Sequence, residues 1–270
     1  MKALFIIFAL LITTISFGQK TKAPKFVFPK QEKKVNPFDK EMDSLIANKH
    51  FNDSIMNQIA NPSIQITHCL EMINFYRKES NLPPLKYNQT LSYGAFIEAT
   101  YLAKHEVFTH DIPNSKYSNR YEVASKIYND SITEDHMEGI ASTPDEMFKI
   151  RKDCPKETAK MSKILRELGG VFMLLGSSGH RASLLFPTDD CIGIYIKDDM
   201  IVTVPGHSHK LTTKEELEMV RKWNYVDKIG ENNKKFESDW DSLFDKVLNN
   251  KPITFEDYKF SNYLVTRMKN

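Results

Sequence analysis

The stretch SSGHRASLLFPTDDCIGIYI, residues 177–196, decides how this chain folds. Gly-His-Arg and several small residues lead into a run rich in isoleucine, and a second β-rich run, Met200–Val204, follows after Asp198-Asp199. Two such runs joined by a polar pair predict an antiparallel hairpin. His180 therefore stands where a helical segment meets a sheet, and it either takes part in chemistry or only fixes that corner.

Helical periodicity accounts for most of the remaining chain. Asn61-Pro62 offers a cap for a helix that ends near Ser80, with apolar residues at helical spacing: Ile66, Cys69, Leu70, Ile73 and Tyr76. Thr90 is expected to cap a second helix that runs to about Glu106. Further helices are expected over 121–128, within 144–175, from Thr212 to about Trp223, and along the charged tail to Asn270.

The first 18 residues read as a cleavable secretory signal peptide. Lys2 supplies the positive start, Leu4–Ile15 the apolar run, and Ser16-Phe17-Gly18 the small residues of a cleavage site. The apolar run is shorter than the about 20 residues that a membrane-spanning helix needs, and no later stretch is long and apolar enough. We therefore expect cleavage after Gly18, a secreted or periplasmic product, and no transmembrane segment after signal cleavage.

The rest of the chain is expected to divide into three parts. Residues 19–60 form a basic linker and an N-terminal helical segment, because residues 19–40 hold seven lysines and three prolines without an apolar period. Residues 61–209 form the main domain, and residues 210–270 a helical C-terminal extension. Along the whole chain 37 basic and 35 acidic residues are mixed, which gives a net charge of +2, so no nucleic-acid partner is expected.

Cysteine and histidine usage leaves two points open. Of Cys69, Cys154 and Cys191, at least one thiol is free. An exported protein allows a Cys154–Cys191 disulfide, and three unpaired, mostly buried thiols are the equal alternative. In Gly206-His-Ser-His209 we interpret the two histidines as exposed loop residues rather than as a surface metal site.

His110, Glu138 and His180 form the candidate site, because each lies at the end of a predicted element. Two neutral imidazoles and one carboxylate are able to bind Zn²⁺ or another divalent cation and to leave a position open for water. Their wide spacing matches no local motif such as H-E-x-x-H. From the residues alone, structural histidines are the stronger alternative.

Four segments, in the same order, resemble the CAP superfamily (cysteine-rich secretory, antigen-five and pathogenesis-related, SCP-like proteins) in its bacterial secreted form. Ile73-Asn-Phe-Tyr-Arg77 with Asn81-Leu-Pro-Pro-Leu85 is similar to "N-x-x-R … G-L-x-P-L", and Phe108-Thr-His110 after Leu91, Ala95 and Ala99 to "L-x-x-x-A … F-S-H". Met137-Glu-Gly-Ile-Ala141 is similar to "G-E-N-I-A", and Gly179-His-Arg with Cys191-Ile-Gly-Ile-Tyr195 to "G-H-R … V-G-V". The resemblance spans roughly residues 65–205.

The resemblance implies an α+β fold: a CAP-type α-β-α sandwich with a small antiparallel sheet between helical layers, here with helical N- and C-terminal extensions. It also implies a central cavity where His110 and His180 hold a divalent metal beside Glu138, and we place Arg181 in the same cleft. The chain departs from the family where Leu174 replaces the usual tryptophan and where the second glutamate has no counterpart.

Three functions follow from this reading. The first is a secreted CAP-domain protein whose cleft binds a lipid, cell-envelope or protein ligand, with or without a divalent metal and without turnover. The second is a zinc-dependent hydrolase in which His110 and His180 are the ligands and Glu138 is the general base. The third is structural: His180 donates a hydrogen bond and Arg181 pairs with an acid, so that both fix the corner between helix and strand.

Overall fold

The structure is a computed structural model that describes residues 36–130, 133–134, 138–142, 155–168, 170–198, 200–208, 212, 214, 218, 236, 238–247, 249 and 251–269. The chain divides into two units, Met1–Lys34 and Val35–Asn270, and every described residue lies in the second. The predicted signal peptide, most of the basic linker, Cys154, His209 and nearly all of the helix expected after Thr212 lie outside the described residues.

The predicted hairpin is present and forms the centre of the sheet. Strands β4 (Cys191–Lys197) and β5 (Met200–His207) pair antiparallel, with Ile194 opposite Thr203. Asp198, in the turn between them, has a φ of 56°. Aspartate tolerates this left-handed conformation, which two-residue hairpin turns favour.

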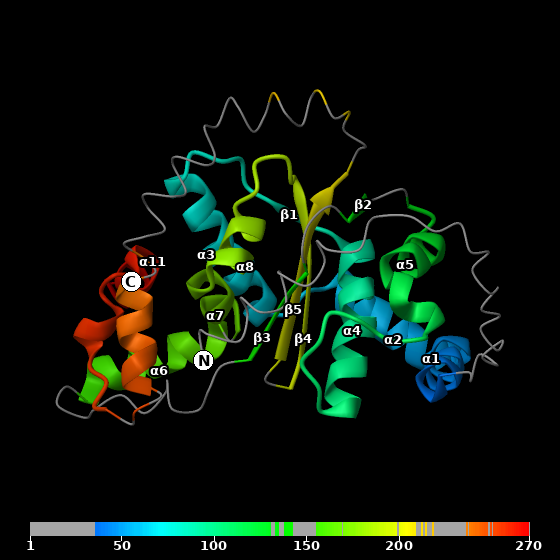
Figure 1. Cartoon of the computed structure of the whole chain (residues 1–270), viewed down its shortest axis with the longest axis horizontal. Coiled ribbons are helices and arrows are strands. Elements are labelled where there is room, and N and C mark those ends of the chain that lie inside the picture. Colours follow the sequence, from blue (N-terminus) through cyan, green and yellow to red (C-terminus); the bar gives the residue numbers. More distant parts are fainter. Residues whose placement is uncertain are drawn as a thin grey trace, which may run out of the picture. The chain divides into compact units, whose positions relative to one another are not determined.

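Three shorter strands complete the described sheet (Figure 1). β2 (Thr133–Glu134) and β3 (Gly139–Ser142) pair antiparallel with β5, whereas β1 (Lys86–Tyr87) pairs parallel with β4. The sheet is therefore mixed, not wholly antiparallel as expected. Strands of two to four residues are too short to show an alternating pattern, so the sequence could not predict them.

One helical layer covers the first face of the sheet. It consists of α1 (Pro37–Ala47), α2 (Lys49–Ala60), α4 (Gln89–His105), η1 (Lys116–Asn119) and α5 (Arg120–Tyr128), and its apolar side chains join Cys191, Val202 and Val204 in one core cluster (Figure 1). Every residue of α4 from Thr90 to Leu102 is buried. Gly193 allows this close approach, because a Cβ there would lie 2.3 Å from the backbone carbonyl carbon of Leu91.

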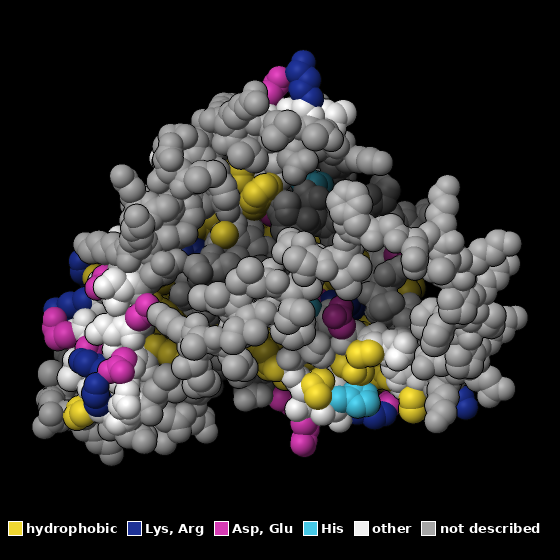
Figure 2. All heavy atoms as spheres, in the orientation of Figure 1, with side chains coloured by type: hydrophobic (Ala, Val, Ile, Leu, Met, Phe, Trp, Pro, Cys, Tyr) yellow, Lys and Arg dark blue, Asp and Glu magenta, His cyan; other side chains and the backbone are white. Residues whose placement is uncertain are grey.

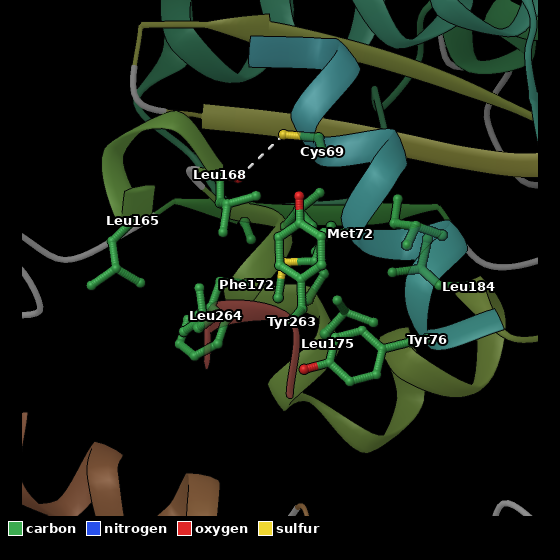
Figure 3. Packing of buried hydrophobic residues seen from close by; sticks show 14 of the residues in the cluster. Cys69, Met72, Tyr76, Leu165, Leu168, Phe172, Leu175, Leu184, Tyr263 and Leu264 are labelled. Carbon is green, nitrogen blue, oxygen red and sulfur yellow. Dashed lines mark hydrogen bonds between the residues drawn. The ribbon is translucent and has the colours of Figure 1, made fainter. Parts of the chain in front are cut away.

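A second helical layer covers the other face, where Ile192, Ile194 and Ile201 point. It contains α3 (Ile64–Glu79), α6 (Pro155–Leu168), α7 (Gly170–Gly176) and α8 (Ser178–Leu184). Figure 3 shows side chains of α3 packed against Leu168 and Phe172, with the Cys69 thiol donating to the Leu168 carbonyl at 3.2 Å. Alternate residues of β4 and β5 thus enter opposite cores, and the α-β-α sandwich implied by the resemblance is confirmed.

The helix boundaries differ from the predicted ones by a few residues at their N-terminal caps. Ser63, not Asn61, caps α3, since its side chain accepts from the Ile66 amide at 3.3 Å. Asn88, not Thr90, caps α4 by accepting from the Leu91 amide at 2.8 Å. The short polar side chains at neighbouring positions are all able to cap, so the sequence alone does not fix which of them starts the helix.

The N-terminal helices begin earlier than the linker prediction allowed, because α1 starts at Pro37 and buries Phe38 and Asp39. The Phe38 ring packs edge-on against Tyr101 of α4 at 5.1 Å between centroids. In the same layer, the Tyr93 hydroxyl donates to the Asn52 side chain at 2.7 Å. These contacts attach the helical part of the N-terminal extension to the domain.

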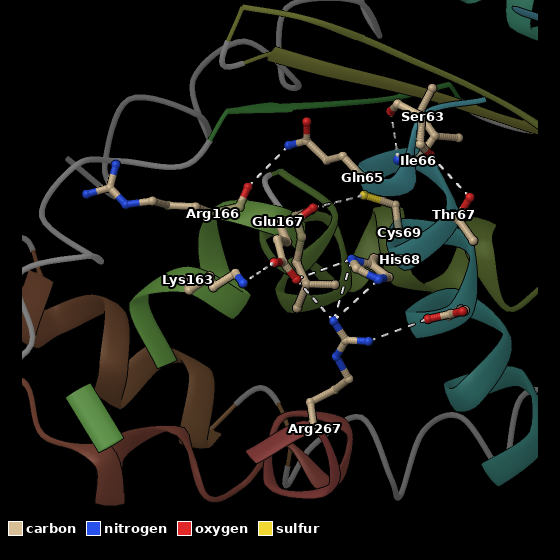
Figure 4. Close-up of polar contacts among 12 residues, drawn as sticks. Ser63, Gln65, Ile66, Thr67, His68, Cys69, Lys163, Arg166, Glu167 and Arg267 are labelled. Carbon is tan, nitrogen blue, oxygen red and sulfur yellow. Dashed lines mark hydrogen bonds and ion pairs between the residues drawn. The ribbon is translucent and has the colours of Figure 1, made fainter. Parts of the chain in front are cut away.

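The C-terminal extension packs on the second layer. It comprises a helix over residues 238–247, η3 (Phe255–Tyr258) and α11 (Asn262–Lys269). The Trp240 ring lies 4.8 Å from that of Phe172, centroid to centroid. Figure 4 shows Arg267 of α11 reaching Glu167 of α6 at 3.1 Å, and His68 of α3 lies 3.2 Å from the same carboxylate. The extension therefore contributes to the same core as the domain.

Two sequence expectations are corrected. Cys191 is a free, buried thiol that donates to the Gly206 carbonyl at 3.2 Å, so the Cys154–Cys191 disulfide is wrong. His207 is not an exposed loop residue: it ends β5 and is buried with its Nδ1 3.7 Å from Oδ1 of Asp189. The error at His207 arises because β5 runs three residues further than its apolar pattern indicated.

None of the described helices has the length and the apolar character that crossing a membrane requires. On the face drawn in Figure 2, described hydrophobic side chains form small separate groups among charged and polar ones. Among the described residues, the large hydrophobic side chains that remain exposed are Ile64, Val107 and Phe108.

Candidate functional site

The structure brings His110, Glu138 and His180 together. His110 lies in the loop after α4, Glu138 immediately precedes β3, and His180 lies in α8. The His110 Nδ1 atom is 3.5 Å from Oε2 of Glu138, and the two imidazole centroids are 6.2 Å apart. Three segments that are distant in the sequence therefore meet at one place.

Glu138 is held by two neighbours from α5. Arg120 donates from Nη2 to Oε2 of Glu138 at 2.6 Å and from Nε to Oε1 at 3.2 Å, while the Tyr121 hydroxyl also donates to Oε1. Arg120 reaches back to the loop as well, where its Nη2 donates to the His110 carbonyl at 3.2 Å. The guanidinium therefore fixes both the carboxylate and the backbone of the histidine.

Glu98 is a site residue that the sequence reasoning missed. It comes from α4, is fully buried, and places its Oε2 2.9 Å from Nε of Arg120, so Arg120 lies between two carboxylates. Burial, followed by the negative charge of Glu138, raises the pKa of Glu98 to about 8 despite the opposing effect of Arg120. A signal was present in the sequence, because Glu98 is the one charged residue in the buried run from Thr90 to Leu102.

The two histidines have opposite electrostatic environments. The interaction with the Glu138 carboxylate raises the pKa of His110 above its ordinary value, against a smaller opposing effect of burial. Burial, together with the charge on His110, lowers the pKa of His180. The pKa values of the two neighbouring histidines are therefore shifted in opposite directions.

Two exposed apolar side chains lie close to His110 in the sequence. Val107 and Phe108 precede His110 in the loop, and Phe108 is 62% exposed. The His110 side chain is itself 46% exposed, whereas Glu138 beneath it is buried. The site thus presents one accessible imidazole, backed by a buried network of charges and flanked by exposed apolar surface.

Arg181 does not lie where the sequence interpretation put it. Its side chain is 6% exposed, and its guanidinium carbon lies 3.9 Å from the Phe236 ring centroid and 5.5 Å from that of Tyr76. It lines a different cavity, formed with the C-terminal extension. His180 and Arg181 are adjacent in α8, where consecutive side chains point about 100° apart, so the two residues serve different surroundings.

The donor set does not fit a tightly held zinc ion. Over the part of the chain that the structure describes, no group of three or more His, Cys, Asp or Glu side chains is arranged to hold a metal. Both oxygens of Glu138 already accept hydrogen bonds from Arg120, and the guanidinium would lie beside the cation. His110 and His180 alone provide two of the three protein ligands that a catalytic zinc site uses.

Comparison with known proteins found one family model and two similar solved structures. Residues 70–199 match the family model described as CAP, the Cysteine-rich secretory protein family. None of the curated proteins matches the chain. Among solved structures, the chain is similar to an outer surface protein from Borrelia burgdorferi at 21% identity and a TM-score of 0.37, covering 53% of this chain and 92% of that one.

A second similar structure is a cysteine-rich secretory protein from Staphylococcus aureus, at 17% identity and a TM-score of 0.36. The alignment covers 53% of this chain and spans 38% of the staphylococcal one. The segment 70–199 that matches the CAP family model contains His110, Glu138 and His180 together with strand β4, and over this segment the chain is similar to CAP proteins.

Proposed function

We propose that this is an exported CAP-domain protein that binds an anionic amphiphile, such as a fatty acid or an acidic lipid of the cell envelope, at His110 and His180 without converting it. The contact between His110 and the buried Glu138 carries the proposal, because it supplies a fixed, charged imidazole at an accessible surface. Export rests on the predicted signal peptide and places the protein outside the cell or in the periplasm.

The charge of the site favours an anionic head group. Arg120 is positively charged, and the Glu138 carboxylate beside His110 raises the pKa of that imidazole, which favours its positive form. Burial raises the pKa of Glu98 to about 8, so Glu98 adds little negative charge near neutral pH. Asp111 follows His110 in the chain, but it is exposed, so solvent and salt screen its charge. These groups favour an anionic over a cationic head group.

The apolar neighbours favour a hydrocarbon tail. Phe108 and Val107 expose hydrophobic side chains within three residues of His110, and exposed apolar side chains beside a polar site are typical of ligand-binding surfaces. An amphiphile would satisfy both features, with its head group at the imidazoles and its tail against Phe108.

The geometry gives less support to the zinc-dependent hydrolase. A general base needs a carboxylate that is free to accept a proton from water, and Glu138 is occupied by Arg120 and Tyr121.

The test is displacement of the fluorescent fatty acid cis-parinaric acid by oleate on the full chain. We expect saturable binding that the His110→Ala/His180→Ala variant loses and that Phe108→Ser weakens. The control is His50→Ala, which removes an exposed histidine on α2. Equal binding by the double variant and the parent would overturn the proposal, and N-terminal sequencing of the exported protein, expected to begin at Gln19, tests export separately.

A further inference from the structure

An open cavity of about 600 Å³ lies away from the histidine site. It is lined by the C-terminal end of α3, by Arg181 of α8 and by described residues of the C-terminal extension between Phe236 and Asn262. Its volume is within the range of small-molecule sites, about 300–1,000 Å³. Most of its lining comes from residues beyond the segment 70–199 that matches the family model.

Aromatic rings form one wall of this cavity. The Tyr76 and Phe236 centroids are 5.8 Å apart, and those of Phe236 and Phe260 are 5.0 Å apart. Arg181 already lies over the faces of Phe236 and Tyr76. Among the described residues, no cation lies over the third ring of the wall, Phe260. The negative face of an aromatic ring attracts ammonium and guanidinium groups.

Carboxylates surround the same cavity. Glu256 pairs with Lys259 at 2.6 Å, and Asp257 pairs with Lys246 at 2.5 Å. Glu79 and Asp239 also line it, and neither has an ion pair within the described residues; Glu79 accepts from the Asn262 amide at 3.4 Å. Among the described lining residues, four carboxylates stand against the two cations Arg181 and Lys259, so this part of the lining has a negative balance of charge.

We propose that this cavity binds an organic cation, a primary ammonium or guanidinium group on an apolar stem. The cation would lie between Glu79 and Asp239, and the stem would pack against Phe260. This site is distinct from the histidine site in position and in sign of charge, and it does not depend on the proposed binding of an amphiphile. The cation belongs either to a small free amine or to a basic side chain of a peptide.

The test is calorimetric titration of the full chain with agmatine and, separately, with trilysine. The variant Glu79→Gln/Asp239→Asn neutralises the two carboxylates and keeps their shape. The matched control, Asp53→Asn/Asp241→Asn, removes the same net charge at exposed positions that do not line the cavity. We expect the first variant to weaken binding about tenfold, as the loss of two partly exposed ion pairs implies, and the control to change it less than about twofold.

The two probes separate the sources of the cation, because stronger binding of agmatine indicates a small amine and stronger binding of trilysine a peptide side chain. Binding should survive in the His110→Ala/His180→Ala variant, so failure of the amphiphile proposal and failure of this one are distinguishable. The proposal is overturned if neither probe binds, or if the Glu79→Gln/Asp239→Asn variant binds as tightly as its control.

Discussion

The Nδ1 atom of His110 lies 3.5 Å from Oε2 of Glu138, although one residue follows α4 and the other precedes β3. Arg120 explains why this arrangement is stable, since it binds the Glu138 carboxylate and the His110 carbonyl at once. The accessible imidazole is therefore positioned by a buried guanidinium, and the properties of the site depend on buried charged groups.

We expect Glu138→Gln to lower the pKa of His110. The carboxylate interaction is the largest cause of the raised value, and glutamine keeps the shape but removes the charge. The raised pKa means that His110 adds stability below its unfolded pKa, and this contribution is lost as pH rises through the folded pKa. NMR titration of the His110 ring in the parent and in the Glu138→Gln variant checks the shift, and an unchanged His110 titration would contradict the assignment.

Glu98 should make the protein less stable as pH rises. Its folded pKa of about 8 lies above the ordinary 4.5, so the folded state holds a proton that the unfolded state has released between these values. Relative to Glu98→Gln, the parent should lose up to about 1.4 kcal/mol per pH unit in this window. Urea unfolding of both proteins at pH 5, 6.5 and 8 measures the difference, and a constant difference would argue against a protonated Glu98.

Arg120→Met should destabilise the fold by about 3–5 kcal/mol, because it leaves two buried carboxylates without their cation. Adding Glu98→Gln should restore little of this loss at neutral pH, because Glu98, whose pKa is raised to about 8, already holds a proton there. The control is Lys126→Met, which breaks an exposed pair with Glu122 and should cost less than about 1 kcal/mol. Chemical denaturation measures all three variants, and similar losses for Arg120 and Lys126 would contradict the network.

Zinc should not bind tightly at the histidine site. His110 and His180 provide two ligands, and Glu138 is already bound by Arg120. In calorimetric titrations with zinc, we expect the full chain and its His110→Ala/His180→Ala variant to behave alike. Neither should show tight one-to-one binding at this site. Stoichiometric binding that the variant loses would mean that a ligand outside the described residues completes the site, and it would favour the hydrolase.

The C-terminal extension should be required for the stability of the domain. Leu264 of α11 is completely buried in the core cluster that contains Phe172 and Ile194, so Leu264→Ala should cost about 2–5 kcal/mol. Ile64→Ala, at an exposed position, should change the unfolding free energy by less than about 0.5 kcal/mol. Equal unfolding midpoints for the two variants would show that α11 is not part of the cooperative unit.

The long elements were predictable, because their patterns are local. The hairpin of β4 and β5 follows from two β-rich runs around Asp198, and α3 and α4 follow from helical periodicity. The short strands β1, β2 and β3 were not predictable from the sequence. They are strands because they pair with β4 or β5, and their own composition does not indicate a strand.

The candidate site was predictable only in part. His110, Glu138 and His180 could be selected through the resemblance to CAP proteins, and the structure brings them together. Arg120 and Glu98 could not be selected as site residues from the sequence, because nothing in their local sequence shows that their side chains meet. Arg181 was placed in the wrong cavity, since its position in the chain beside His180 does not fix the direction of its side chain.

By itself, the sequence determined the secondary structure of the long segments, the order of the family motifs and the identity of the three polar residues, because these depend on periodicity and on local chemistry. Only the tertiary structure decided that Arg120 lies between Glu98 and Glu138, that the pKa values of the two histidines shift in opposite directions, and that the C-terminal extension lines a cavity away from them. Burial and proximity set the energies of charged groups, and both arise only when distant segments pack together.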